Sequence, residues 1–236
     1  MAAHADGQDV VPSSPARNNH YDFVLAAIAV GAAAEQAVPH TPGELRPYAY
    51  AATRIMMATA RLTDMLRRTC AAVAGTPDSI GRVVDAAQSH IVEAQIQLDA
   101  AAEPDGHQDV IPETFRSAAS AITRAGHGLT CSTPEEVASA AALTSTITMR
   151  SGQLAHQLVR LSVVVSAPHS TIDPLVAAAA ELTHAVDALD LAAGAIRSRH
   201  VRAAELMAFE REEHRMRLHG ATERQPVRPA PPTLGI

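Results

Sequence analysis

Apolar residues recur at helical spacing in six stretches of the chain, and polar, proline and glycine residues separate these stretches. Pro39 ends the first stretch and Gly75 closes the second. Thr41 and Thr133 each precede a proline and are followed three positions later by glutamate, the signature of a capping box at a helix start. The pattern predicts helices over residues 19–38, 41–74, 76–103, 113–128, 133–166 and 171–218, and therefore an all-α protein.

The second and fifth stretches share an apolar repeat of 3.5 residues, which is typical of helices that pack along a seam. In the second stretch the a and d positions are Leu45, Tyr48, Ala52, Ile55, Thr59, Leu62, Leu66, Thr69 and Val73. In the fifth stretch they are Val137, Ala140, Thr144, Ile147, Ser151, Leu154, Leu158, Leu161 and Val165. We expect both helices to pack in the same way.

The two halves of the chain resemble each other when the sequence is shifted by 92 positions. The two Thr-Pro-x-Glu caps then coincide, and Phe23 falls on Phe115. The shift becomes 91 near Leu98-Asp99, which pair with Leu189-Asp190. Chance similarity of alanine-rich helices explains alanine on alanine, but it does not explain the caps and the apolar series together. We therefore infer an internal duplication.

Duplication predicts two three-helix modules, at residues 19–104 and 105–196, related by a pseudo-twofold axis in one six-helix bundle. In the alternative arrangement, each module pairs with another chain. Residues 1–18 read as a flexible leader, 197–219 as a helical extension of the last helix, and 220–236 as a disordered proline-rich tail. The apolar run at 23–34 imitates a secretion signal, but its counterpart lies mid-chain, so we read it as the first helix of its module.

Composition narrows the class of protein. The chain holds 49 alanines and no lysine among its 236 residues, and its aromatic fraction is 3%. Alanine favours helices, whereas the aromatic and β-branched strand formers are sparse, which disfavours sandwiches, barrels and doubly wound sheets. Such composition is typical of GC-rich genomes, for example actinobacterial ones. Two cysteines without metal spacing fit a reducing, cytoplasmic setting, and no apolar run reaches the roughly 18 residues of a membrane span.

Net charge disfavours nucleic acid as a partner, because the chain carries −6 at pH 7. The charge is unevenly distributed. Residues 1–195 hold 11 arginines and 20 acids, whereas residues 196–236 hold 8 arginines and 5 acids. The C-terminal basic segment interleaves its arginines with glutamates, which cancel much of the field.

An arginine stripe is the candidate ligand-binding feature. Arg54, Arg61 and Arg68 are seven positions apart and share a helix face with Tyr50. Guanidinium groups suit carboxylates and phosphates, so this face could bind an anionic ligand. In the alternative reading the face is a solvated ion network, in which Asp64 pairs with both Arg61 and Arg68.

A metal site is a weaker reading. Glu181 and His184 have the Glu-x-x-His spacing of di-iron bundles, and His90-x-x-Glu93 lies near the counterpart stretch in reversed order. The counterpart at a shift of 92, residues 89–92, lacks the motif, so we favour solvated polar faces and expect no metal and no cofactor. The chain also lacks a Gly-rich phosphate loop, His-Glu-x-x-His, Cys-x-x-Cys and Gly-x-Ser-x-Gly.

The helical extension is the candidate interaction segment, because it outruns its counterpart and carries Val201, Leu206, Phe209 and Met216. We expect a non-catalytic protein–protein interaction or scaffolding protein that self-associates through this segment, with another protein as a further possible partner. An anionic-ligand-binding bundle is the second hypothesis. An enzyme with a His/acid site inside the bundle is the third.

Overall fold

The computed structural model describes residues 15–102 and 111–222, with side chains at 20–102 and 111–199. Within these ranges all regular structure is helical and no strand occurs, which confirms the all-α prediction. The helices are α1 (Pro15–Gln36), α2 (Pro42–Ala72), α3 (Asp78–Ala102), α4 (Glu113–His127), α5 (Pro134–Val164) and α6 (His169–Thr222). Most of the expected leader and tail lies outside the described residues, but positions 15–18 belong to α1 and 220–222 to α6.

The chain divides into two compact units, Met1–Ile196 and Arg197–Ile236. The first unit contains α1 to α5 and the part of α6 that ends at Ile196. In the second unit the described structure is a single helical segment, Arg197–Thr222.

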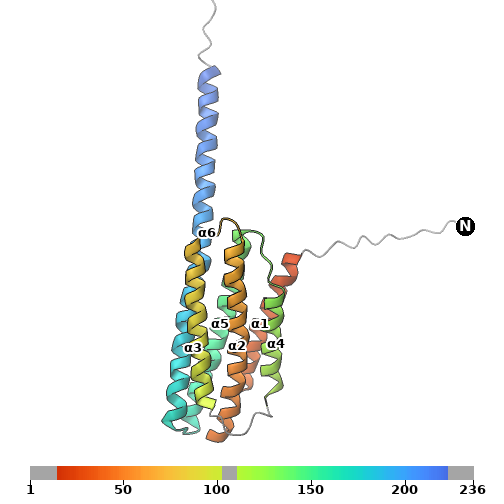
Figure 1. The fold of residues 1–236 in the computed structure, drawn as a ribbon, viewed down its shortest axis with the longest axis vertical. Helices are drawn as coiled ribbons and strands as arrows, with labels where there is room; N and C mark the ends of the chain where they lie inside the picture. Colours follow the sequence, from red (N-terminus) through yellow and green to blue (C-terminus); the bar gives the residue numbers. More distant parts are fainter. Residues whose placement is uncertain (1–14, 103–110, 223–236) are drawn as a thin grey trace, which may run out of the picture. The chain divides into compact units, whose positions relative to one another are not determined.

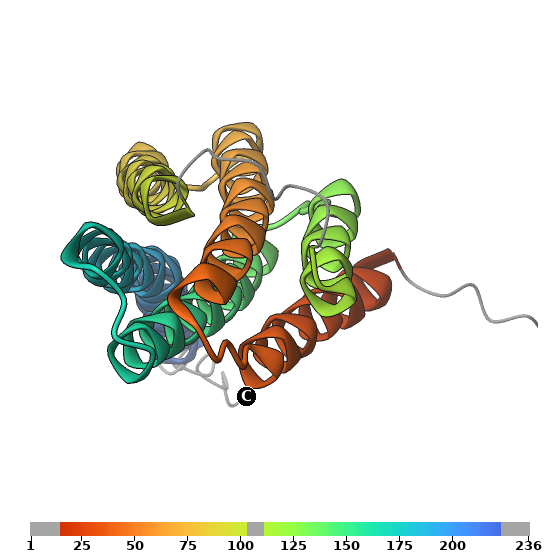
Figure 2. The same ribbon diagram turned by 90° about the horizontal axis from the view of Figure 1, so that it is seen from below.

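The first unit is a bundle of two helix layers. α2 packs against α3 and α4, and α1 packs against α5. α6 lies beside α5, as the close approach of Leu182 on α6 to Gly152 on α5 shows. The layers α3–α2–α4 and α6–α5–α1 are seen end-on in Figure 2, and their helices run along a roughly common direction in Figure 1. Across the layers α2 meets α5 and α1 meets α4, and a His90–Glu181 contact joins α3 to α6.

This arrangement places the first helix of each half in the layer of the other half. α1 packs on α4 and α5, whereas α4 packs on α1 and α2. Exchanging α1 with α4, α2 with α5 and α3 with α6 leaves these contacts unchanged. The two halves are therefore intertwined within one compact unit, instead of standing as two separate three-helix bundles.

The core is built from corresponding positions of the two halves. Phe23 and Phe115 are both 1% exposed, and the a and d positions of the two seams are buried or half-buried throughout. Small side chains at the remaining contacts, such as Ala26, Ala118 and Gly152, let the helix backbones approach closely. A core rich in alanine buries little area per residue, which is why α2 and α5 each extend over 31 residues.

Hydroxyl groups are accommodated in this core by their own helices. In α2 the hydroxyls of Thr59 and Thr63 each donate to the carbonyl four residues earlier, at 2.9 Å. In α5 the hydroxyls of Thr144 and Thr148 do the same at 2.8 and 2.9 Å. These four buried hydroxyls are thus satisfied within their own helices, so they impose no partner on the facing helix.

The two predicted capping boxes differ. The hydroxyls of both Thr41 and Thr133 accept from the backbone N–H of the glutamate three residues later, at 3.3 Å. Glu136 returns a bond to the Thr133 N–H and closes the box. Glu44 instead accepts from the N–H of His40 at 2.8 Å. The prediction of a complete box is therefore confirmed at Thr133 only.

The shift between the halves changes in the turn after the second helix, earlier than the sequence comparison placed it. α2 and α5 begin and end 92 positions apart, but α3 and α6 begin 91 apart. The turns have left-handed residues at Gly75 (φ 87°) and Ser166 (φ 54°), which are also 91 apart. Val84 is buried, and so is Leu175 at a shift of 91, whereas Val176 at a shift of 92 is 49% exposed. The last helix consequently begins at His169, ahead of the predicted 171.

Candidate functional site

The arginine stripe lies on α2, on the side toward α4. Arg54, Arg61 and Arg68 are exposed and Tyr50 is half-buried. The seven-residue spacing corresponds to nearly two helical turns, so the three guanidinium groups follow one line along the helix. The predicted common face is therefore present.

Two adjoining pockets form a groove between α2 and α4. One of about 480 Å³ is lined by Arg61, Arg68, Met65, Ile122 and His127, among others. The second, of about 330 Å³, is lined by Arg54, Arg61 and Ser120, among others. Arg61 borders both pockets, and the groove combines apolar side chains such as Ile122 with three arginines and the carboxylate of Asp64. Gly126 lets α4 pack closely on α2 beside this groove, because a Cβ there would lie 3.2 Å from the sulfur of Met65.

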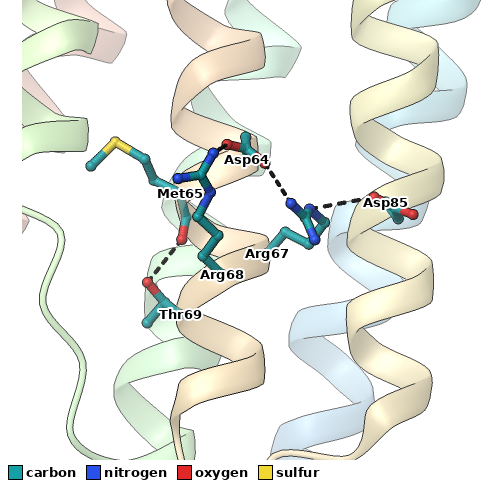
Figure 3. Close-up of polar contacts among 6 residues, drawn as sticks. All are labelled: Asp64, Met65, Arg67, Arg68, Thr69 and Asp85. Atoms are coloured by element: carbon teal, nitrogen blue, oxygen red, sulfur yellow. Dashed lines mark hydrogen bonds and ion pairs between the residues drawn. The ribbon is translucent and has the colours of Figure 1, made fainter.

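Asp64 anchors a small ion network at one end of this face (Figure 3). Its carboxylate binds Arg67 at 2.8 Å and Arg68 at 2.6 Å, and Arg67 also reaches Asp85 of α3 at 3.5 Å. The hydrogen bond from Arg67 lowers the pKa of Asp64 most, desolvation opposes it, and Arg68 lowers it further. The network links α2 to α3 and engages Arg68.

Arg54 and Arg61 differ from Arg68, because neither has an ion-pair partner among the described residues. The expected pair between Asp64 and Arg61 does not form. Arg67 pairs with Asp64 in place of Arg61. One Asp64 oxygen contacts Arg67 and the other contacts Arg68. The groove therefore presents two guanidinium groups whose charge the described residues leave uncompensated.

The other half of the bundle has a corresponding groove between α1 and α5. A pocket of about 360 Å³ there is lined by Glu35, Ile28, Thr146 and Arg150, among others. Thr146 corresponds to Arg54, and Glu35 corresponds to His127. A pocket thus lies between the corresponding pair of helices, but its charged lining includes both an acid, Glu35, and a base, Arg150.

A histidine–carboxylate cluster lies between α3 and α6, where the sequence led us to expect solvated polar faces. His90 Nδ1 lies 2.6 Å from Glu181 Oε2, and the rings of His90 and His184 are 5.4 Å apart. Glu93 bonds to Gln97 at 2.7 Å. At the observed shift of 91, His90 corresponds to Glu181 and Glu93 to His184, so the two motifs are reciprocal. Comparison at a shift of 92 concealed this signal.

This cluster is a polar contact between layers. In the part of the chain that the structure describes, no group of three or more His, Cys, Asp or Glu side chains is arranged to hold a metal ion. The described helices also include none with the length and apolarity that crossing a bilayer requires.

Both cysteines are free, and burial raises the pKa of the Cys70 thiol to about 11.

The interaction residues predicted in the extension, Val201, Leu206, Phe209 and Met216, lie on the helical segment Arg197–Thr222, outside the residues whose side chains are described. Comparison of the chain with protein-family models, curated proteins and solved structures found no match.

Proposed function

We propose that this protein is a non-catalytic helical interaction protein that acts in the cytoplasm and self-associates through the helical segment Arg197–Thr222. One observation carries the proposal: this segment belongs to a compact unit of its own, in which it is the described structure. A single helix cannot bury its own apolar side chains, and most helical stability in proteins comes from packing an apolar face. Val201, Leu206, Phe209 and Met216 therefore need a partner surface.

Light scattering of the full chain and of a chain that ends after Arg197 tests this proposal. We expect the full chain to be a dimer or larger and the shortened chain to be a monomer with unchanged helical packing, seen by near-complete retention of its NMR spectrum. Two folded monomers would contradict the proposal.

A point variant of the full chain separates apolar contact from charge. Phe209→Glu should shift the assembly to monomer, because it places a charge in the proposed contact. His219→Glu adds the same charge to the same helix without removing an apolar side chain, and it should leave the mass unchanged. If both variants dissociate the assembly alike, charge and not apolar contact governs it.

The groove between α2 and α4 supports a second candidate function, the binding of an anionic ligand. The supporting observation is the pair Arg54 and Arg61, which border the groove without an ion-pair partner among the described residues. Uncompensated guanidinium groups beside apolar side chains favour a carboxylate or phosphate attached to an apolar body.

Calorimetric titration with inorganic tripolyphosphate at low salt tests the arginines of this groove. We expect saturable binding that weakens as salt rises and that falls at least tenfold in Arg61→Gln. The matched control is Arg160→Gln, which removes an exposed arginine at the position corresponding to Arg68. Absence of saturable binding, or an equal loss in the control, would exclude this candidate.

We further propose that the two halves arose by duplication of one three-helix module. The exchange of helix contacts and the matching burial of Phe23 and Phe115 support this origin. The change of shift from 92 to 91 corresponds to one residue fewer in the turn between α5 and α6 than in the turn between α2 and α3.

A further inference from the structure

Phe23 and Phe115 occupy corresponding buried positions, but they have different neighbours. The ring of Tyr48 on α2 lies against Phe115 of α4, with centroids 5.8 Å apart and planes tilted by 52°. The position corresponding to Tyr48 is Ala140 on α5, beside Phe23 of α1. One half of the bundle therefore has an aromatic ring where the other half has a methyl group.

A cavity of about 310 Å³ lies beside Phe23 and Ala140. Leu129 and Leu143 line it where the other half has Ala37 and Ala51. These two larger side chains form apolar walls but leave the space open. The cavity is thus explained by the replacement of a phenolic side chain by alanine between two otherwise corresponding helices.

Polar groups surround the apolar part of this cavity. The Glu136 carboxylate accepts from the N–H of Ser132 at 2.6 Å and of Thr133 at 3.3 Å, and it borders the cavity as a further acceptor. Burial raises the pKa of Cys131 to about 11, with smaller effects of Glu136 and Cys70. At neutral pH the thiol is therefore uncharged, and a neutral sulfur makes favourable contacts with aromatic rings.

We propose that this cavity is a binding site for a small monocyclic aromatic molecule that carries a hydrogen-bond donor, such as a phenol. The ring occupies the space beside Phe23 that corresponds to the Tyr48 ring beside Phe115, and the donor reaches the carboxylate side of the cavity. The volume is at the lower end of ligand pockets, which run from about 300 to 1,000 Å³, so it suits one ring.

Titration of the full chain with phenol, followed by amide NMR shifts, tests the proposal. We expect saturable shifts with a dissociation constant in the millimolar range at Phe23, Ala140 and Leu143. Ala140→Tyr should fill the cavity with the chain's own ring and abolish these shifts. Met149→Tyr adds the same ring at an exposed position of α5 and should leave phenol binding unchanged.

Ser139→Trp provides a second block of the cavity from an exposed position, in case Ala140→Tyr does not fold. It should weaken phenol binding at least tenfold. Toluene has the ring without the donor and should bind at least fivefold more weakly than phenol. The proposal is overturned if the full chain gives no saturable shifts, if both blocking variants bind phenol as the parent does, or if toluene binds equally well.

Discussion

The groove between α2 and α4 and the groove between α1 and α5 have corresponding helical walls but different chemistry. The first has Arg54 and Arg61 on its rim and a Tyr48 ring packed on Phe115. The second has Thr146 on its rim and an open cavity beside Phe23. Many buried positions agree, such as Phe23 with Phe115 and Ile55 with Ile147, because closely packed helices tolerate few changes of volume.

The rim residues Arg54, Arg61 and Thr146 are exposed, so packing does not constrain these positions and they differ between the halves. The asymmetry is concentrated where a ligand or partner could reach the bundle. This contrast indicates that a shared core serves stability, and that binding is to be sought where corresponding positions differ.

The largest effect is expected at the two corresponding phenylalanines. Phe115→Ala should lower the free energy of unfolding by about 4 kcal/mol, within the usual range for buried phenylalanine. Phe23→Ala should cost about 1 kcal/mol less, because Phe23 borders a cavity and lacks the Tyr48 ring contact. Urea unfolding with comparable m-values measures both. Equal losses would mean that the ring contact adds nothing.

A smaller effect is expected in the turns where the shift changes. Gly75→Ala should destabilise the protein by about 1 kcal/mol, because its positive φ disfavours a Cβ. Ser166→Gly should stabilise it by about 0.5 kcal/mol, since a serine already bears that strain. Thermal unfolding of both variants measures whether each substitution lowers or raises the stability of the protein. A stabilising Gly75→Ala would contradict the correspondence of the turns.

The smallest effect is expected at Asp64, whose corresponding residue in the other half is His156. Asp64→Asn should cost about 0.5 kcal/mol, the usual scale for an exposed ion network. Because folding lowers the pKa of Asp64 from 3.8, its contribution is present above that value and is lost as the pH falls through the lower folded pKa. Unfolding measured from neutral to acidic pH should show the parent and the Asp64→Asn variant converge. The control His156→Ala, at an exposed position, should leave the free energy of unfolding unchanged at neutral pH.

Much of the fold follows from sequence, because helix starts, helix ends and apolar faces are local properties. The caps at Thr41 and Thr133, the seam through Ile55 and Ile147, and the arginine face were all predictable from spacing. The last helix was misplaced at its start, because Pro174 resembles a first-turn proline and yet lies inside α6.

The sequence by itself determined which faces of the helices are apolar, since a 3.6-residue period is written in the order of residues. Only the tertiary structure decided which helix each face meets. The sequence suggested that α1 completes its own three-helix module, but it packs on α4 and α5. The His90–Glu181 contact, the Arg67–Asp64 pair and the cavity beside Phe23 all depend on that choice of neighbours. Periodicity specifies a face, whereas the partner of that face is selected by how well two surfaces fit in three dimensions.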